Sequence, residues 1–342
     1  MTSPTARALL LALVVGAASQ GDVALGAERI APKVLVITMF ADEAKPWLDG
    51  RAFDTRIPIP GLPATFPEVA CDAAGLCLMT TAMGYANAAV STAVTAFSDR
   101  LDLTRTYVLI AGIAGVDPAE GTTGGAYWAR YVVDGGLRHA IDPRQIPAGW
   151  PNGIVALGAA APGEKPQWSA GTEVYTLNPA LAERAFALTR GVPLADSDTA
   201  RAYRARYPEP AAKAPPAVGL CDTVSSDTWW HGSLIAQGMR DWSALMTDGA
   251  ARLCTSQMED NATLTALKRA ADIGRLDFDR VAVLRTASDF DREAPGETPI
   301  ASLLADAGGF GPAATNAYRV GSAFADAVIT GWSAWSEGVP AD

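Results

Sequence analysis

The chain has 342 residues, of which 49% are hydrophobic and 19% are charged, which suffices for the core of one large α/β domain or of two modest ones. Its formal net charge is -10, it contains two histidines, and no basic stripe runs through it. Nucleic acid and anionic membrane surfaces are therefore poor partners on electrostatic grounds.

The N-terminus predicts a secretory signal peptide over residues 1–27. Arg7 precedes the apolar run Ala8–Ala18, "ALLLALVVGAA", and small residues follow the run. This run is too short to span a bilayer, and no other apolar run approaches the roughly 18 to 20 residues that a membrane span requires. We expect cleavage after Ser19 or after Gly26 and an exported protein, periplasmic or extracellular, without stable membrane insertion. A buried N-terminal helix is the alternative.

Strands and helices alternate along the rest of the chain, which predicts an α/β layered domain. The predicted strands are Lys33–Phe40, Leu76–Gly84, Thr106–Gly115, Ala126–Val133, Pro216–Val224 and Arg280–Thr286. The predicted helices are Ala86–Phe97, Pro179–Thr189, Ser233–Met246, Glu259–Ala271 and Tyr318–Trp335. A charged, proline-rich stretch near 194–217 interrupts the pattern, and we interpret it as an exposed insertion within a single domain over residues 28–342.

The four cysteines are compatible with two disulfides if the protein lies in an oxidising compartment. Cys71 and Cys77 bracket the turn-like segment "DAAGL" and are the favoured pair. For Cys221 and Cys254, a disulfide and two buried free thiols are both open. A zinc site is not expected, because the spacing does not fit and neither histidine is clustered with the cysteines. No metal or cofactor is predicted.

Four polar segments follow predicted strands or open predicted helices. They are "TMFADEAKPW" with Asp42 and Glu43, "SSDTWWHG" with Asp227, Trp229, Trp230 and His231, "SQMEDNA" with Glu259, and "RTASDFDR" with Asp289. Taken singly, each acid fits the first turn of a helix, where carboxylates are favoured. Four such segments in one α/β sheet favour a shared site, since open α/β sheets bind ligands beyond the carboxyl ends of their strands.

A small-residue turn, "AGIAG" from Ala111 to Gly115, ends one predicted strand. Its residues allow a ligand to approach the backbone closely, with tight packing as the plainer interpretation. The turn lacks the acidic residue and the spacing of a dinucleotide fingerprint. The chain also lacks a GxSxG elbow, a Walker loop, an HExxH motif and a GxGxxG motif that opens a helix.

"QMED" before a helix, followed by "RTASDFDR", resembles the motifs of the purine nucleoside phosphorylase and nucleosidase superfamily. Over nearly the whole chain after the signal, "ITMFADEAKPWL", "AGIAGVDPAEGTTGGAYWARYVVDGGLRHAID" and "SSDTWWHG" are similar to the purine nucleoside permease family. The resemblance implies a nucleoside phosphorylase-like fold, a three-layer sandwich with a central mixed sheet flanked by helices. It also implies a purine nucleoside as ligand, a link to nucleoside uptake and, as in superfamily relatives, a possible homo-oligomer.

The resemblance assigns the sugar and base contacts. Glu259 corresponds to the glutamate that binds the ribose hydroxyls, and Met258 lies under the sugar. Asp289 corresponds to the acid that hydrogen-bonds or protonates N7 of the base, a role that burial assists by raising its pKa. Ser288 and Arg285 are expected to orient Asp289.

The aromatic segment is assigned more broadly. Trp229 is expected to stack on the base, and Trp230 either contributes backbone contacts to the base edge or packs in the core. Asp227 is grouped with these binding residues, and His231 is expected near the ribose 5′ region. His139 is interpreted as a structural hydrogen-bonding residue.

Hydrolysis is favoured over phosphorolysis, because "AGIAG" carries no cation where phosphorolytic members carry an arginine. Glu43 matches the glutamate that activates water in hydrolytic members, with Asp42 the weaker candidate. The backbone of Ile113, Ala114 and Gly115 is expected near the attacking water. The sequence thus predicts a purine nucleosidase. The alternatives are a non-catalytic nucleoside-binding component of a transport route and a phosphate-dependent phosphorylase.

Overall fold

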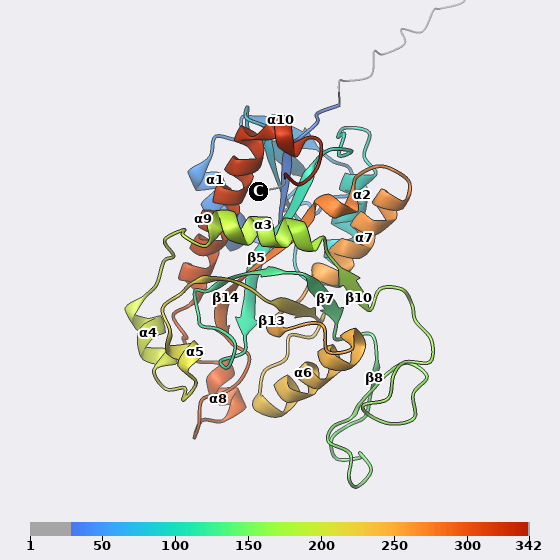
Figure 1. The fold of residues 1–342 in the computed structure, drawn as a ribbon, viewed down its shortest axis with the longest axis vertical. Helices are drawn as coiled ribbons and strands as arrows, with labels where there is room; N and C mark the ends of the chain where they lie inside the picture. Colours follow the sequence, from blue (N-terminus) through green and yellow to red (C-terminus); the bar gives the residue numbers. More distant parts are fainter. Residues whose placement is uncertain (1–28, 341–342) are drawn as a thin grey trace, which may run out of the picture.

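A computed structural model describes residues 29–340, and Figure 1 shows the fold. The strands of its large sheet are β1 (Val34–Thr38), β2 (Thr55–Pro58), β3 (Glu68–Cys71), β4 (Leu76–Thr80), β5 (Tyr107–Val116), β6 (Ala126–Ala129), β7 (Tyr131–Asp134), β10 (Val174–Thr176), β11 (Val218–Leu220), β12 (Asp222–Ser225), β13 (Leu253–Gln257) and β14 (Val281–Phe290). Two short strands, β8 (His139–Ala140) and β9 (Ile154–Val155), pair separately.

The helices are α1 (Ala41–Gly50), α2 (Tyr85–Ala96), α3 (Pro179–Thr189), α4 (Asp198–Arg204), α5 (Pro210–Lys213), α6 (Ser233–Thr247), α7 (Asp260–Asp272), α8 (Pro299–Leu303), α9 (Phe310–Thr330) and α10 (Trp332–Trp335). A 3-10 turn, η1 (Phe278–Arg280), leads into β14. In Figure 1, α2 and α7 lie together on one side of the sheet, whereas α1 and α9 lie together on the other.

Strand β5 organises the sheet. It runs parallel to β1 and β14, and its C-terminal end pairs antiparallel with β13. β14 also pairs with β6, which continues after Arg130 into β7, and β7 leads through β12 back to β13. These pairs close a ring of strands, from which β1, β4, β3 and β2 extend as an open wing. The sheet is therefore mixed, as predicted.

Strand β1 shows why helices cover both faces of the sheet. All five of its residues are buried, as expected of a strand with parallel neighbours on both sides. Successive side chains point to opposite faces. Val34 and Val36 pack in a core with α1, α3 and α9, whereas Leu35 and Ile37 pack in a core with α2 and α7. The three-layer α/β prediction is thereby confirmed.

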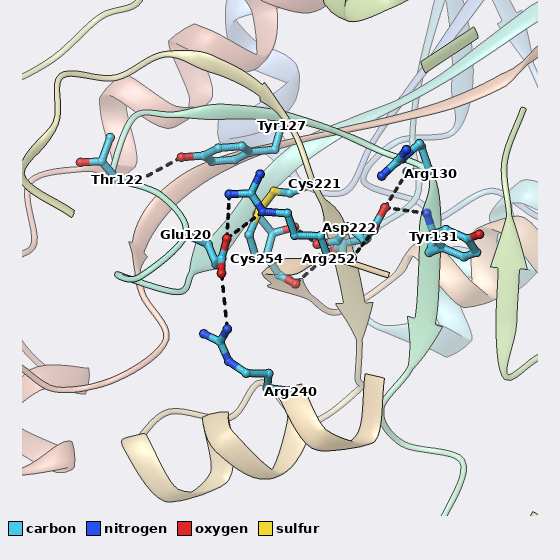
Figure 2. The surroundings of a disulfide bond; sticks show 12 residues. Glu120, Thr122, Tyr127, Arg130, Tyr131, Cys221, Asp222, Arg240, Arg252 and Cys254 are labelled. Atoms are coloured by element: carbon cyan, nitrogen blue, oxygen red, sulfur yellow. Dashed lines mark hydrogen bonds and ion pairs between the residues drawn. A yellow bond between two sulfur atoms is a disulfide. The ribbon is translucent and has the colours of Figure 1, made fainter. Parts of the chain in front are cut away.

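Both cysteine pairs are joined by disulfides. Cys71 and Cys77 lie opposite each other across the hairpin of β3 and β4. Cys221 precedes β12 and is bonded to Cys254 in β13, as Figure 2 shows. For the second pair, which the sequence left open, the structure has the disulfide and not free thiols.

Charged residues around the second disulfide hold the neighbouring strands together (Figure 2). The carboxylate of Asp222, which is fully buried, accepts hydrogen bonds from the amides of Tyr131 (2.8 Å) and Arg252 (2.7 Å). Glu120 pairs with Arg240 of α6 and with Arg252. These contacts connect the starts of β7, β12 and β13, whose opposite ends lead toward the candidate site.

Several element boundaries differ from the sequence prediction: the strand predicted over Leu76–Gly84 ends at Thr80, and those predicted over Ala126–Val133 and Pro216–Val224 are each divided into two strands. Two further differences affect the candidate site. Strand β14 runs on to Phe290, because residues beyond Thr286 still pair with β5. The "RTASDFDR" segment therefore lies largely within the strand instead of following it. Helix α9 begins at Phe310 and ends at Thr330, so it starts earlier than the predicted Tyr318 and ends before Trp335.

The stretch near 194–217, which we expected to be exposed, contains α4 and α5. Its Tyr203 and Tyr207 side chains are buried against Phe290, so the segment covers the end of β14 instead of projecting wholly into solvent. The predicted signal peptide, 1–27, lies outside the described residues. Among the helices within residues 29–340, none combines the length and apolarity that crossing a membrane requires.

Candidate functional site

A cavity of about 390 Å³ opens at the C-terminal ends of β5 and β14. Residues from distant parts of the chain line it, and three of them are carboxylic acids. The lining consists of Phe40, Glu43, Met83, Ile113, Ala114, Gly115, Trp229, Ser256, Gln257, Met258, Glu259, Ser288, Asp289 and Phe310. Glu43, Glu259 and Asp289, which the sequence predicted to share a site, therefore face one cavity.

Glu43 is held in place by the backbone. It lies in the first turn of α1, and its Oε2 accepts a hydrogen bond from the Met39 amide at the end of β1 (2.7 Å). Its Oε1 accepts a hydrogen bond from the Ile113 amide in β5 (2.7 Å). Burial raises the pKa of Glu43 to about 7, although the nearby charge of Arg285 and the two amides oppose the shift.

The "AGIAG" segment is part of β5, and its glycines give functional groups room. A Cβ at Gly112 would lie 2.6 Å from Oε1 of Glu43 and 2.6 Å from Nη1 of Arg285. Only a glycine lets these two groups approach the strand so closely. Gly112 thus serves the site because it has no side chain, whereas Ile113, Ala114 and Gly115 line the cavity.

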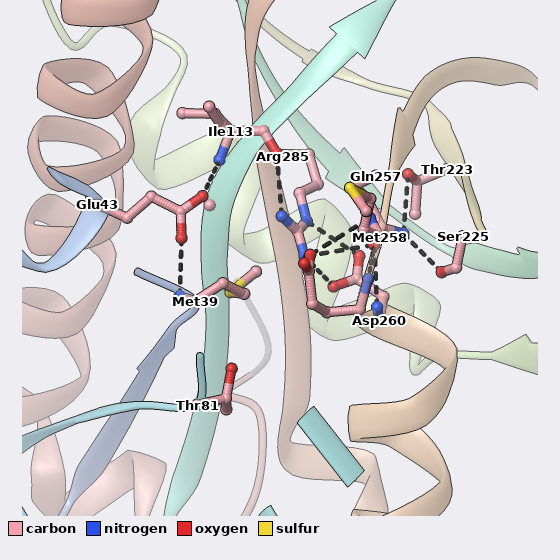
Figure 3. A network of polar contacts seen from close by, with 12 residues as sticks. Met39, Glu43, Thr81, Ile113, Thr223, Ser225, Gln257, Met258, Asp260 and Arg285 are labelled. Carbon is pink, nitrogen blue, oxygen red and sulfur yellow. Dashed lines mark hydrogen bonds and ion pairs between the residues drawn. The ribbon is translucent and has the colours of Figure 1, made fainter. Parts of the chain in front are cut away.

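Arg285 differs in position from the sequence prediction. Its guanidinium is fully buried and pairs with both carboxylate oxygens of Asp260 (Nε to Oδ2, 3.1 Å) (Figure 3). It also donates to the Ile113 carbonyl (3.0 Å) and lies 3.7 Å from Oε2 of Glu259. Arg285 therefore does not orient Asp289. It supports the side of the cavity that Glu43 and Glu259 form.

Glu259 is positioned by the turn that begins α7. The side-chain oxygen of Gln257 accepts hydrogen bonds from the amides of Glu259 (2.8 Å) and Asp260 (2.9 Å), and so caps this helix end. The Glu259 carboxylate accepts a hydrogen bond from the Gly84 amide (3.1 Å). Burial raises its pKa, while the charge of Arg285 acts in the opposite direction. Met258 lines the cavity beside it.

A β-bulge sets the direction in which the Asp289 side chain points. The pairing of β14 with β5 shifts between Ala287 and Asp289, so Ser288 is an extra residue that turns the strand. The Ser288 hydroxyl lies within hydrogen-bond distance of the Asp289 carboxylate and of the Ala114 carbonyl (3.1 Å each). Burial raises the pKa of Asp289 to about 7, because the Ser288 hydroxyl compensates only in part.

Two buried polar atoms beside the cavity have no hydrogen-bond partner among residues 29–340. Oδ1 of Asp289 and Oγ of Ser256 are buried, and neither forms a hydrogen bond within the described residues. A Cβ placed on Gly115 would contact Ser256 at 2.9 Å, the Trp229 ring at 3.0 Å and Oδ1 of Asp289 at 3.3 Å. These groups therefore surround one small space beside an indole ring. Buried polar atoms need partners, so this space suits a ligand with polar edges.

Several other predicted residues do not line this cavity. Trp230 is buried in a core cluster with Met239 and Trp242, which favours the packing interpretation. Asp227 is exposed, and its carboxylate accepts a hydrogen bond from the Tyr85 amide (2.7 Å) at the start of α2. The weaker candidate Asp42 is exposed on α1.

The two histidines are also placed by the structure. His231 lies beside Trp229, with ring centroids 5.7 Å apart and the rings tilted by 35°, but it lines an adjoining cavity and not the one that contains Glu259. The expected contact with the ribose 5′ region is therefore not supported by its position. His139 is exposed in β8.

An apolar rim of the cavity was missed from the sequence. Phe40, Met83 and Phe310 line it, and the Phe40 and Phe310 rings lie 6.2 Å apart. Phe310 was missed because the start of α9 was placed too late. Gln257 and Asp260 stand within the quoted "QMED" motif, but their capping and ion-pairing roles depend on the strand-to-helix turn that only the structure shows.

The fold is nucleoside phosphorylase-like, as predicted, and is similar to that of solved nucleosidases. A 5′-methylthioadenosine/S-adenosylhomocysteine nucleosidase from Neisseria meningitidis superimposes with a TM-score of 0.51 at 18% identity, covering 86% of this chain and 98% of that one. Futalosine hydrolase of Helicobacter pylori superimposes with a TM-score of 0.52 at 14% identity, covering 86% and 97%. At these identities the likeness concerns the fold alone.

The chain belongs to the purine nucleoside permease family, whose sequence profile matches residues 31–340. A probable purine nucleoside permease of Schizosaccharomyces pombe is 35% identical over 321 residues, which cover 89% of this chain and 91% of the relative. A purine nucleoside permease of Candida albicans is 36% identical over 269 residues and is covered over 66% of its length. The resemblance that the motifs indicated is thereby confirmed.

Proposed function

We propose that this protein binds a purine nucleoside in the cavity at the C-terminal ends of β5 and β14 and hydrolyses its N-glycosidic bond to free base and ribose, in a process linked to nucleoside uptake. The observation that carries the proposal is the convergence of Glu43, Glu259 and Asp289 on one cavity. The names of the family and of the yeast relatives support purine nucleosides as ligands and uptake as the context.

The ribose is assigned to the part of the cavity formed by Glu259 and Met258. A carboxylate accepts hydrogen bonds from two neighbouring hydroxyl groups, as the 2′ and 3′ positions of ribose provide. Its negative charge also stabilises the oxocarbenium-like sugar that forms as the glycosidic bond breaks. The Gly84 amide and the α7 cap fix this carboxylate before the sugar arrives.

The base is assigned to the space between Trp229 and Asp289. An indole face offers a stacking surface for a purine, a contact worth roughly 1 to 3 kcal/mol per base. Oδ1 of Asp289 and Oγ of Ser256 have no hydrogen-bond partner among residues 29–340, and the polar edge of a purine satisfies them. With a pKa near 7, Asp289 holds a proton over part of the neutral range and delivers it to N7 as the base departs.

Water is the second substrate of this proposal. Glu43 is buried, has a pKa of about 7 and is fixed by two amides, so its carboxylate removes a proton from water at a defined position. None of the cavity-lining residues in the described part of the chain is a lysine or an arginine. The buried guanidinium of Arg285 is engaged by Asp260 and the Ile113 carbonyl. A phosphate dianion therefore meets no free cation, which favours hydrolysis.

The test is a panel of nucleosides incubated with and without inorganic phosphate. We expect inosine or adenosine to give free base and ribose at a rate that phosphate does not change. Strict dependence on phosphate identifies a phosphorylase, and tight binding without any release identifies a capture protein. Glu43→Gln should abolish release while preserving binding, and Asp42→Asn on the same helix is the matched control.

We also propose that the protein is exported. The predicted signal peptide motivates this proposal, and two disulfides support it, since such bonds persist in oxidising compartments. N-terminal sequencing of the mature protein is the direct measurement. Cleavage after Ser19 or Gly26 is expected, and an intact Met1 contradicts export.

A further inference from the structure

A second cavity adjoins the first on the other side of Asp289. Its volume is about 160 Å³, and it shares Trp229, Ser288, Asp289 and Phe310 with the larger cavity. Its remaining walls come from His231, from the end of β14, from α4, and from α8 with the segment that links it to α9. The larger cavity contains every group that we assign to the ribose and the base. An unsubstituted nucleoside therefore does not need the smaller cavity.

The lining of the second cavity is mixed, with Asp306 among its polar residues. Phe290, Leu303 and Ala307 contribute apolar surface, and the hydroxyls of Tyr203 and Ser302 hydrogen-bond each other (3.0 Å). A cavity of about 150 Å³ lined by apolar side chains is large enough to hold benzene. By its volume, the space beside Asp289 therefore accommodates a phenyl-sized or short branched alkyl group, for which Phe290, Leu303 and Ala307 provide the apolar contacts.

His231 is a polar residue of this cavity that shares the lining with the acids Asp289 and Asp306. Both of its ring nitrogens are buried and lack a hydrogen-bond partner within the described residues. Burial lowers its pKa against the opposing charges of Glu293 and Glu297, so the ring is neutral at physiological pH. A neutral imidazole offers one donor and one acceptor, which suits a polar atom that joins a bulky group to a base.

We propose that the second cavity receives a bulky substituent at position 6 of the purine, so that N6-substituted purine nucleosides are substrates or ligands of this protein. This inference rests on the proposed function. Asp289 contacts the edge of the base that carries N7. On this edge, N7 lies between C8 and the exocyclic group attached to C6. A large group at C8 disfavours the anti glycosidic conformation, whereas a group at C6 does not affect it. Position 6 is therefore the point at which a substituent enters the smaller cavity.

Direct binding measurements test this assignment. Adenosine, N6-benzyladenosine and 8-benzylaminoadenosine are titrated into the full-length Glu43→Gln variant, which should bind nucleosides without cleaving them, and Kd is measured by calorimetry. We expect N6-benzyladenosine to bind at least as tightly as adenosine, and the 8-substituted compound to bind about tenfold more weakly or worse. A Kd for N6-benzyladenosine tenfold above that of adenosine, or preferred binding of the 8-substituted compound, overturns the inference.

Variants of the cavity wall sharpen the test. Ala307→Phe fills the smaller cavity and should raise the ratio of the N6-benzyladenosine Kd to the adenosine Kd by about tenfold. Leu304→Phe is the matched control, because Leu304 is 77% exposed and does not line the cavity, and its ratio should not change. If the Ala307→Phe variant does not fold, Ala305→Leu is the second variant, because Ala305 also lines the smaller cavity and a leucine there reduces its volume. An unchanged ratio in the filled variant refutes the inference.

The outcomes separate this inference from the function on which it rests. Binding of adenosine with rejection of N6-benzyladenosine overturns the second cavity alone. Failure to bind any purine nucleoside overturns both. Binding without cleavage removes the proposed hydrolysis and leaves the assignment of the second cavity to be decided by the same Kd values.

Discussion

Asp260 and Arg285 form a fully buried ion pair directly behind the cavity that Glu43 and Glu259 line. The carboxylate of Asp260 engages two nitrogens of the guanidinium, and the third nitrogen donates to the Ile113 carbonyl. The amide of that same residue donates to Glu43. The Asp260 carboxylate therefore neutralises the charge of the Arg285 guanidinium, which would otherwise act fully on Glu43 and Glu259.

Removing the charge of Asp260 should change the pH dependence of cleavage. In Asp260→Asn, an acceptor oxygen remains, but Arg285 becomes an unbalanced cation that favours the ionised form of Glu43. The pKa of Glu43 should fall, so the acid limb of the kcat/KM profile should move about one unit to lower pH. Asp272→Asn, at the exposed end of α7, is the control. An acid limb that stays in place or moves upward contradicts this account of the ion pair.

Replacing Asp289 should separate binding from chemistry. Asp289→Asn keeps the size of the side chain and removes the proton donor for N7. We expect cleavage of inosine or adenosine to fall by about 10²-fold or more, as loss of a general acid typically causes. The Kd for the nucleoside should change far less. Wild-type turnover in this variant rules out Asp289 as the acid.

Replacing Glu259 should change sugar selectivity. Glu259→Gln retains one acceptor but loses the charge-assisted hydrogen bonds to the ribose hydroxyls, so discrimination between ribonucleosides and 2′-deoxyribonucleosides should decrease by about tenfold. The ratio of kcat/KM values for adenosine and 2′-deoxyadenosine measures this effect. An equal loss on both sugars argues against contact with the 2′ hydroxyl. Glu183→Gln on the exposed face of α3 is the control.

Burial of Asp289 should destabilise the fold at neutral and higher pH. Its pKa is about 7 in the folded protein and near its ordinary value of 3.8 in the unfolded chain. Between these values the folded state binds the extra proton, so stability falls as pH rises from about 4 to about 7. Asp289→Asn should therefore gain roughly 1 to 3 kcal/mol relative to wild type at pH 8, and little at pH 4. Urea unfolding at both pH values measures the difference, and an equal effect at both is inconsistent with a buried titrating carboxyl.

The two disulfides should differ in their contribution to stability. Cys221 and Cys254 are 33 residues apart, whereas Cys71 and Cys77 are six apart. A disulfide restricts the unfolded chain more when it closes a longer loop. Serine substitution of both Cys221 and Cys254 should therefore lower the free energy of unfolding by roughly 3 to 4 kcal/mol, and the same change at Cys71 and Cys77 should lower it by roughly 2 kcal/mol. Denaturant unfolding of the two double variants compares them. A larger loss from the shorter loop contradicts the entropic argument.

The sequence predicted those parts of the molecule that local patterns specify. Strand β1 was found from its apolar run, and Glu43, Glu259 and Asp289 were found because each stands at a strand end or a helix start in a recognisable motif. The position of Arg285 was not predictable from spacing. Its direction depends on the pairing of β14 with β5 and on the fully buried partner Asp260.

Other features depend on contacts between distant segments. The bulge at Ser288 exists only relative to the register of β5, and the rim residue Phe310 reaches the cavity because α9 begins earlier than its amphipathic pattern suggests. The second cavity arises where α4 and the α8–α9 segment cover the end of β14. No local pattern encodes such an enclosure, because its walls are distant in the chain.

The ring of strands around β5 has a consequence for how molecules enter and leave. Amides of β5 and β14 that pair within this ring should be among the slowest in the protein to exchange with deuterated solvent. Met83 and Phe310, by contrast, are 58% and 46% exposed at the rim. Passage into the cavity is therefore expected to depend on displacement of these peripheral side chains and their segments, while the scaffold that carries the acids stays still.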